Sequence, residues 1–401
     1  MAARSTNVTL VNQAGRFNLL KLKQELDHGE WTSEPPAVIG NLGSWESESD
    51  GFATGTEGRV VYQIQTDEGE VIGQVRLHWD NPFVGSNSYD EGVTPQATSA
   101  TTPGFSVVHT GGGGDNASVT FTLLNGCCSV SESGEISCAV ASPVVSDKQR
   151  LAAIWEATPG PNWFAVHGLT SAEYQQRFDE LLAQGFRPVD VSGYSVDGQD
   201  RYAAIFSQRG GPAFQARHGL TNAQYQQTFD ELVGQGFRLL DVSGYEVGGE
   251  DRYAAIFEQS PGPAFIARHG LTNPQYQAAF DEAVGQGFRL RKVSGYGVRG
   301  QDLYAAIWEA DGGPAFVARH GLSNPDYQAA FDQFVGQGFR LRQVSGYDVG
   351  GQDRYAAIWE ADGGPAFTAR HGLTSDQYQQ TFDQLVAQGF RLTNVSGYSV
   401  G

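Results

Sequence analysis

One phrase recurs five times in the second half of this chain, at a spacing of 51 residues. Versions of RYAAIWEADGGPAFTARHGL begin at Arg150, Arg201, Arg252, Leu303 and Arg354, and the last repeat runs to Gly401. A period of this length is typical of repeat architectures, in which each unit buries its apolar face against its neighbours. The spacing therefore predicts five similar units, at 150–200, 201–251, 252–302, 303–353 and 354–401.

Within one repeat, the sequence predicts a β-hairpin followed by two helices. Gly350 and Gly351 separate two β-prone runs in VSGYDVGGQDRYAAIWE, and such a pair favours a hairpin turn because a positive φ costs glycine little. GPAFVARHG, which starts near Pro314 and ends at Gly321, predicts a short helix of about two turns. A longer helix is predicted after Ser323. The N-cap residues of the matching helices fit the capping-box pattern in Thr170/Glu173, Thr221/Gln224, Thr272/Gln275 and Thr374/Gln377.

The two ends of the array differ from its middle. The first repeat starts at the second strand of a hairpin and the last stops after a first strand. Val395–Val400 could therefore pair with Leu151–Trp155 in a curved or ring-like array, which would remove two exposed sheet edges. Alternatively, AVASPVVSDK is an altered first strand that caps an open arc. Repeat 1 also departs from the others at Leu151, Asn162, Trp163 and Val166, as expected of a terminal unit that faces another domain.

Residues 1–124 show no repeat and predict an all-β sandwich. The β-prone runs NVTLVN, RVVYQIQ, VIGQVRLHW and ASVTFTLL alternate with turn signals. Residues 125–149 are predicted to be a linker that carries Cys127, Cys128 and Cys138. Either Cys128 and Cys138 close a small loop, or the three thiols remain free. The whole chain is thus predicted to be an α+β multidomain protein.

The net charge of −19 restricts the partners of this chain. An acidic protein without a basic run repels phosphate backbones, so nucleic acid is not expected as a partner. Neutral or zwitterionic membrane lipids and cell-surface glycans remain. The N-terminal MAARSTNVTLVNQAG has no apolar signal core. We therefore expect secretion without an ordinary signal peptide, or a cytoplasmic location until release.

Three stretches of the first half resemble the aegerolysin family. These are HWDNPFVGSNSY at 78–89, ESDGFATGTEGRVVYQI at 48–64 and LDHGEWTSEPPAVI at 26–39. Aegerolysins are small acidic β-sandwich proteins related to crystal toxins and haemolysins, and the resemblance covers roughly residues 5–124. It implies a leaderless, lipid-recognising protein that can work with a separate pore-forming partner.

The second half resembles the bacterial tandem repeat domain, which is known by the phrases RYAAIW and VSGY. The resemblance covers residues 150–401 and all five copies. This repeat also occurs beside a β-lactamase-like serine hydrolase domain in fungal polyglycine hydrolases. No SxxK phrase of such a domain is found in this sequence, so the resemblance does not imply hydrolase activity here.

Aromatic and acidic residues around the 78–89 stretch form the candidate lipid site. Aromatic side chains on a loop tip suit a membrane interface, and carboxylates beside them can accept hydrogen bonds or hold a choline or ethanolamine cation. The candidates are Trp31, Trp45, Trp79, Phe83, Tyr89, Glu57 and Asp80. In the alternative interpretation, Trp79 packs inside the sandwich and the carboxylates are solvated.

The repeats carry a second set of candidates. Each predicted short helix ends in His167, His218, His269, His320 or His371, where a histidine complements the helix dipole. Arginine precedes four of them, at Arg217, Arg268, Arg319 and Arg370. A hydrolase would need these histidines beside the helix residues Asp179, Asp230, Asp281, Asp332 and Asp383. No spacing indicates a metal or cofactor site.

Two aromatic positions recur in the predicted hairpins. Trp155, Phe206, Phe257, Trp308 and Trp359 are interpreted as core, because Trp and Phe exchange there. The phrase Ser-Gly-Tyr is the same in all copies and ends in Tyr194, Tyr245, Tyr296, Tyr347 and Tyr398. These tyrosines either pack in the interior or line a groove for a glycan or peptide.

The leading hypothesis is a non-enzymatic lipid- or cell-surface-binding protein of toxin or defence type. The sandwich would recognise membrane lipid, and the repeats would act as a multivalent adaptor, since repetition strengthens weak sites. The alternatives are a lectin or peptide-binding repeat protein with the sandwich as fusion partner, and a hydrolase with a His–Asp pair in each repeat.

Overall fold

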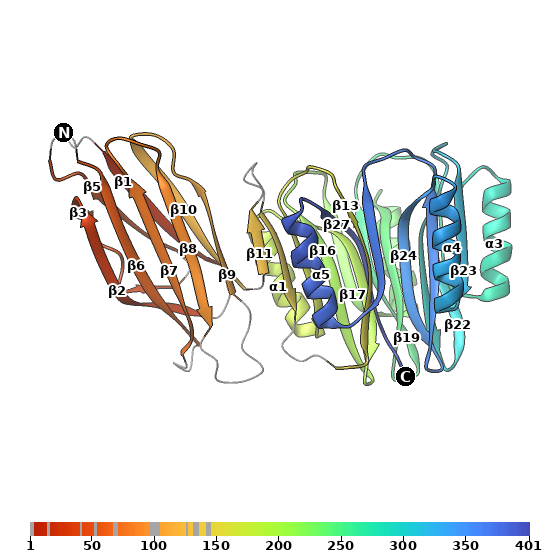
Figure 1. Cartoon of the computed structure of the whole chain (residues 1–401). Helices are drawn as coiled ribbons and strands as arrows, with labels where there is room; N and C mark the ends of the chain where they lie inside the picture. The colour runs from red at the N-terminus through yellow and green to blue at the C-terminus, as the bar shows by residue number, and fades with distance from the viewer. Residues whose placement is uncertain are drawn as a thin grey trace. The chain divides into compact units, whose positions relative to one another are not determined.

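The computed structural model describes residues 4–13, 17–40, 42–51, 54–66, 71–95, 105–125, 127–130, 136–141 and 146–401. The chain divides into two compact units, Met1–Pro143 and Val144–Gly401 (Figure 1). Over the described ranges, no helix is both long and apolar enough to cross a membrane.

The N-terminal unit contains two five-stranded sheets. The first consists, in spatial order, of β3 (Glu30–Ser33), β5 (Leu42–Glu48), β1 (Ser5–Gln13), β10 (Asn116–Asn125) and β9 (Phe105–Gly111). The second consists of β4 (Val38–Ile39), β2 (Asn18–His28), β6 (Thr56–Gln65), β7 (Val71–Asn81) and β8 (Ser88–Pro95). β1 and β10 pair in parallel, whereas the neighbouring pairs are antiparallel.

The two sheets share one hydrophobic core. Alternate residues of β6 and β7 are buried, as expected of strands with one face toward a core. Val60 and Leu77 from these strands belong to the same cluster as Val8 and Phe121 of the first sheet. The predicted all-β first half is therefore confirmed.

The cysteine segment forms a short antiparallel pair, β11 (Cys127–Val130) and β12 (Ile136–Ala141). The backbone register places Cys128 opposite Cys138. The choice between a disulfide and free thiols stays open, because these side chains lie outside the described part of the structure.

The repeats form five units, each with one helix and three antiparallel strands. Unit 1 contains β14 (Trp163–Leu169), α1 (Ser171–Ala183), β15 (Arg187–Val196) and β16 (Gln199–Ser207), and unit 2 contains β17 (Phe214–Thr221), α2 (Asn222–Gly234), β18 (Arg238–Val247) and β19 (Glu250–Glu258). Unit 3 contains β20 (Phe265–Thr272), α3 (Asn273–Gly285), β21 (Arg289–Val298) and β22 (Gln301–Glu309), and unit 4 contains β23 (Phe316–Leu322), α4 (Asn324–Gly336), β24 (Arg340–Val349) and β25 (Gln352–Glu360). In unit 2 the strands lie in the order β17-β19-β18, and the other units repeat this order.

Unit 5 is completed by a strand from the start of the array. It contains β26 (Phe367–Leu373), α5 (Ser375–Ala387) and β27 (Arg391–Ser399), and β13 (Gln149–Glu156) lies between its two strands. Leu151 pairs with Gly397 of β27 and with Leu373 of β26. The predicted pairing of Val395–Val400 with Leu151–Trp155 is thus confirmed.

The predicted short helix is wrong, because GPAFVARHG forms strand β23 in this repeat and a strand in every other repeat. The segment between Pro314 and Gly321 is too short to be a stable helix by itself. Its backbone groups instead pair with β25, where Val317 lies opposite Trp359. Gly321 has a φ of 65° and belongs to a bulge rather than to a helix end.

The hairpin turn and the long helix follow the sequence prediction. Gly350 and Gly351 both have positive φ between β24 and β25, as a tight hairpin turn requires. The side chain of Ser323 accepts a hydrogen bond from the Asp326 amide at the start of α4. Capping boxes are present at Thr170, Thr221, Thr272 and Thr374.

The cap of α2 provides a first prediction. Thr221→Ala removes the side-chain oxygen that accepts from the Gln224 amide, and we expect it to lower the free energy of unfolding by about 1 kcal/mol. Thr228→Ala, inside the same helix, is the matched control and should be neutral or slightly stabilising. Urea unfolding of the full chain measures both. An equal loss in the two variants would contradict the capping role.

Candidate binding surfaces

The loop between β7 and β8 presents an apolar tip. Val84 is 84% exposed and Phe83 is 37% exposed, within residues 82–87 of the N-terminal unit. The loop is held in place from its base, because Arg4 Nη2 donates to the Phe83 carbonyl over 2.8 Å and Asn87 Nδ2 donates to the Gly112 carbonyl over 2.7 Å. An exposed apolar side chain on a fixed loop loses little conformational entropy when it is buried against a partner.

The tryptophans predicted at this site lie below it. Trp79 and Trp45 are fully buried, and Trp79 Nε1 donates to Ser47 Oγ over 3.1 Å. Trp31 packs edge-on against Trp79 with ring centroids 5.7 Å apart. As a correction to the sequence prediction, Trp45 and Trp79 cannot touch a ligand in this structure, because the alternating β7 pattern turns Trp79 into the core.

Tyr89 supports the loop and does not form its tip. Its hydroxyl donates to the Gly112 carbonyl over 2.8 Å, and its ring packs on His109 and Phe121. Only Phe83 among the predicted aromatics of this stretch therefore reaches the exposed tip. Val84, which the sequence analysis did not select, is more exposed than any of them.

The two predicted carboxylates face each other across β6 and β7. Glu57 and Asp80 are direct partners in the strand register. His78 Nε2 lies 3.1 Å from Glu57 Oε1, and His28 Nε2 lies 3.8 Å from Glu57 Oε2. Burial, and then the nearby Glu57, raise the pKa of the Asp80 carboxyl above its ordinary value. The strand register thus places two carboxyl groups side by side next to the base of the loop.

The repeat histidines pack between tyrosines at the junctions of the units. His320 lies edge-on to Tyr276 and Tyr304, with ring centroids 4.7 and 5.2 Å apart, and its Nε2 is 3.0 Å from Asn273 Oδ1. His218 and His371 bond likewise to Ser171 and Asn324. Burial lowers the pKa of His218, His269, His320 and His371. The predicted role as helix-end caps is wrong, because the histidines lie in strands.

The helix aspartates have different partners. Asp332 Oδ1 accepts from Gln328 Nε2 over 2.8 Å, one helical turn away on α4. The same contact joins Gln175 to Asp179, Gln226 to Asp230, Gln277 to Asp281 and Gln379 to Asp383. These aspartates thus bond to glutamines, whereas His218, His320 and His371 bond to Ser or Asn. In the part of the chain that the structure describes, no group of histidine, cysteine and acidic side chains could hold a metal ion.

The arginines that precede the histidines lie on the outer strand of each sheet. Arg217 is exposed on β17 and donates to the Ala216 carbonyl over 2.8 Å, and Arg268, Arg319 and Arg370 make the same contact. A charged side chain on an outer strand hinders pairing with another chain. Val166 takes this position in unit 1 and is fully buried, where an unpaired arginine would be costly.

The constant Ser-Gly-Tyr phrase joins each unit to the next. The Gly295 amide donates to Ser345 Oγ over 3.1 Å, and a Cβ on Gly295 would lie 2.6 Å from Tyr347 Cδ1. The Tyr347 hydroxyl in turn bonds to the Tyr304 hydroxyl over 2.8 Å. The same glycine-to-serine bond joins Gly193 to Ser243, Gly244 to Ser294, Gly346 to Ser396 and Gly397 to Ser192.

Tyr245, Tyr296 and Tyr347 are therefore interior residues, and their rings are buried. The phrase borders a small depression with a volume of about 80 Å³. Its lining combines the Gly-Tyr pairs with Ser195, Glu246, Gly297, Asp348 and Ser399. The five constant tyrosines are part of this lining, beside backbone and polar groups, so the groove for a glycan or peptide stays a prediction.

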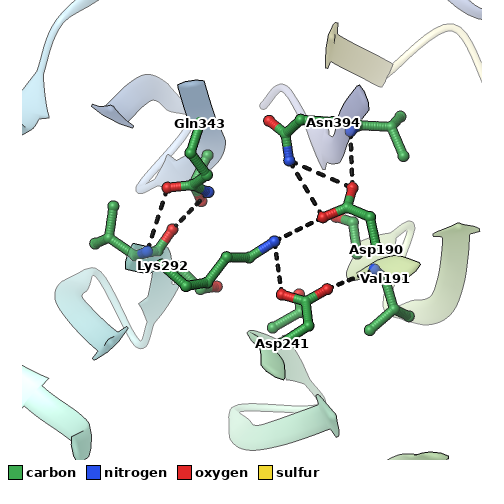
Figure 2. Close-up of polar contacts among 12 residues, drawn as sticks. Asp190, Val191, Asp241, Lys292, Gln343 and Asn394 are labelled. Carbon is green, nitrogen blue, oxygen red and sulfur yellow. Dashed lines mark hydrogen bonds and ion pairs between the residues drawn. The ribbon is translucent and has the colours of Figure 1, made fainter. Parts of the chain in front are cut away.

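A charged cluster that sequence reasoning missed lies at the centre of the repeats. The residue four positions before each constant tyrosine is Asp190, Asp241, Lys292, Gln343 or Asn394. Lys292 Nζ lies 2.7 Å from Asp190 Oδ1 and 2.6 Å from Asp241 Oδ1 (Figure 2). Asn394 Nδ2 donates to both Asp190 oxygens over 3.3 Å. The signal was a single repeat position that carries several different polar residues between constant neighbours.

A belt of ion pairs also joins neighbouring units. In units 1 to 4, the arginine at the start of the strand that follows the helix contacts a glutamate of the next unit and lies over a phenylalanine ring. The pairs are Arg187–Glu258, Arg238–Glu309, Arg289–Glu360 and Arg340–Glu156, at 3.2, 2.6, 2.9 and 3.0 Å. The phenylalanines are Phe214, Phe265, Phe316 and Phe367. The arginine of unit 5, Arg391, lies over Trp163, which also packs on Phe382 of α5.

These features define a protein with a tandem array of α/β units. The array matches the family described as polyglycine hydrolase-like, structural repeat, over residues 160–209, 211–260, 262–311, 313–362 and 364–401. The chain belongs to this family. The matched segments start ten residues after the repeats as divided by sequence, and they coincide with units 1 to 5.

The N-terminal unit is similar to two solved structures. The lipid binding protein Nakanori is 16% identical with a TM-score of 0.26, over 31% of this chain and 73% of that chain. The RahU protein, solved in complex with a TRIS molecule, is 18% identical with a TM-score of 0.23, over 32% of this chain and 98% of that chain.

Proposed function

We propose that this chain is a non-enzymatic lipid- or cell-surface-binding protein of toxin or defence type. The N-terminal unit would contact neutral or zwitterionic membrane lipid through the 82–87 loop. The observation that carries the proposal is the exposed Val84 and Phe83 tip on a loop whose carbonyl and amide groups are bonded at its base. The aegerolysin-like sequence of residues 78–89 agrees with it.

The neighbouring carboxylates supply a polar complement to the apolar tip. Glu57 and Asp80 lie opposite each other on β6 and β7, and Asp80 leads directly into the loop. A choline or ethanolamine group carries the positive charge that this pair would attract. In this proposal, the apolar side chains of the loop tip insert into the membrane, and the carboxylates of Glu57 and Asp80 recognise the lipid headgroup.

The repeat array would serve as a rigid scaffold or adaptor. We propose that its five units close into a ring, as supported by the insertion of β13 between β26 and β27 and by the bond from the Gly397 amide to Ser192 Oγ. The buried tyrosines, and the histidines that pack between tyrosine rings, support a structural role for the repeated positions rather than a glycan groove or a catalytic site. A separate pore-forming partner and leaderless secretion stay predictions.

Vesicle sedimentation tests the lipid proposal. We expect the full chain to bind phosphatidylcholine, phosphatidylethanolamine or sphingomyelin vesicles, and Val84→Asp to weaken binding about tenfold or more, because burial of a valine contributes about 1.5 kcal/mol or more. A circular dichroism spectrum that matches the wild type would show that Val84→Asp, and the control variant described next, remain folded.

Leu42→Asp is the matched control for this test. Leu42 is 65% exposed but pairs with Val11, at the far end of β1 from Arg4 and the loop. It should leave vesicle binding unchanged. Failure of the wild type to bind any of these vesicles would overturn the lipid proposal, and an equal loss in both variants would exclude the 82–87 loop as its site.

A further inference from the structure

Four of the five residues in the charged cluster make the same hydrogen bond to the backbone of a neighbouring unit, and Lys292 does not. In four of five positions, a side-chain oxygen accepts a hydrogen bond from a valine amide of the preceding unit. The bonds run from Val191 to Asp241, Val293 to Gln343, Val344 to Asn394 and Val395 to Asp190, over 2.7, 3.2, 2.9 and 2.9 Å. Lys292 carries only donors and cannot accept such a bond.

Lys292 instead neutralises two particular carboxylates. Asp241 holds unit 2 to unit 1, and Asp190 holds unit 1 to unit 5, through the amide bonds just described. Lys292 belongs to β21 of unit 3 and reaches both of them (Figure 2). The contact with Asp190 therefore joins two units that are not consecutive in the chain.

All three charged groups are buried, with side-chain exposures of 12% for Lys292, 8% for Asp190 and 3% for Asp241. Two carboxylates this close repel each other unless a cation lies between them. The residues at the two remaining positions of the cluster, Gln343 and Asn394, are neutral. Neutralisation of both aspartates by Lys292 thus requires units 1, 2, 3 and 5 to meet around the Lys292 ammonium group.

We infer that Lys292 is a charge lock that fixes unit 1 in its place between units 2 and 5. The constant Ser-Gly-Tyr contacts are alike at every junction, so they do not distinguish one neighbour from another. The cluster does distinguish them, because only the assembled order brings one lysine to both aspartates. Buried polar groups select one arrangement among similar ones in the same way in coiled coils.

Lys292→Gln in the full chain tests the lock. The glutamine can accept an amide bond, as Gln343 does, but it leaves Asp190 and Asp241 without their cation. At pH 8 we expect the melting temperature of the array to fall by about 10 °C. At pH 5 the difference from the wild type should shrink to half or less, because protonation of an aspartate relieves the repulsion.

The double variant Asp241→Asn with Lys292→Gln separates charge from packing. It restores the net charge of the cluster and keeps an oxygen for the Val191 amide, so its melting temperature at pH 8 should lie within about 3 °C of the wild type. If the single variant does not fold, a folded double variant still supports the lock. A double variant as unstable as Lys292→Gln would overturn it.

Hydrogen exchange locates the effect. In Lys292→Gln at pH 8, we expect the largest loss of amide protection in β13, β15 and β27, where units 1 and 5 meet. A merely structural role of the lysine would lower protection around β21 or evenly across all five units. Either of these patterns, or a melting temperature within about 2 °C of the wild type, would overturn the inference.

Discussion

Gly295→Ala is expected to lower the free energy of unfolding of the array by about 3 kcal/mol. The added Cβ would lie 2.6 Å from Tyr347 Cδ1 and 2.8 Å from Tyr347 Cζ, so one of the two strands must move. The ring cannot turn away freely, because its hydroxyl bonds to Tyr304 and accepts from the Gly321 amide. The loss therefore combines overlap at the junction of units 3 and 4 with damage to the tyrosine network.

The same substitution at Gly285 is the matched control for Gly295→Ala. Gly285 is the last residue of α3 in the same repeat, and a Cβ there would meet no atom within 4 Å. Alanine favours a helix over glycine, so we expect this variant to gain up to about 1 kcal/mol. The stability of the array in the two variants is compared by urea unfolding, monitored by hydrogen exchange of peptides from the array. A Gly295→Ala array as stable as the wild type would contradict the packing explanation of Ser-Gly-Tyr.

The repeat period, the hairpin turns and the capped helices could be predicted because each is a local property of the sequence. Gly350 and Gly351 determine their turn by conformation alone, and Thr221 determines the start of α2 by a bond three residues away. The strand at 316–322 could not be predicted in this way. Its partner β25 lies more than thirty residues along the chain, and long-range pairing overrides a weak local preference.

The candidate binding surfaces could also be predicted only in part from local sequence. Trp79 and Phe83 are four residues apart and equally aromatic, yet the first is buried and the second lies at the loop tip. The difference arises from the strand alternation of β7, which ends at Asn81. The central cluster was missed for another reason. A search for repeated residues passes over Lys292, because its function depends on being unlike Asp190 and Asp241 at the equivalent positions.

A buried histidine should make the stability of the array fall as the pH is lowered from 6.5 to 4. His167 of β14 is almost fully buried against Tyr378, with ring centroids 4.7 Å apart. Neither ring nitrogen has a hydrogen-bond partner in the described structure. Burial lowers the pKa of His167 to about 4, from an ordinary value of 6.5.

The sign of this effect follows from proton binding. Between pH 6.5 and 4, the unfolded chain binds a proton at His167 that the folded chain does not, so the stabilisation present above pH 6.5 is lost progressively. A change of this size in pKa corresponds to about 3 kcal/mol. His167→Phe keeps the ring packing and removes the titrating group. We therefore expect it to exceed the wild type in stability slightly at pH 7 and by about 3 kcal/mol near pH 4.

His371→Phe provides the comparison, because it changes the same repeat position where the ring is only half-buried and bonds to Asn324. Urea unfolding at several pH values should give a smaller pH dependence of the difference from the wild type than for His167→Phe. Lysine and aspartate titration elsewhere in the array is common to all three proteins and cancels in these differences. If the His167→Phe and wild-type curves run parallel from pH 7 to 4.5, His167 is protonated or solvated in the folded protein, and the buried neutral state is wrong.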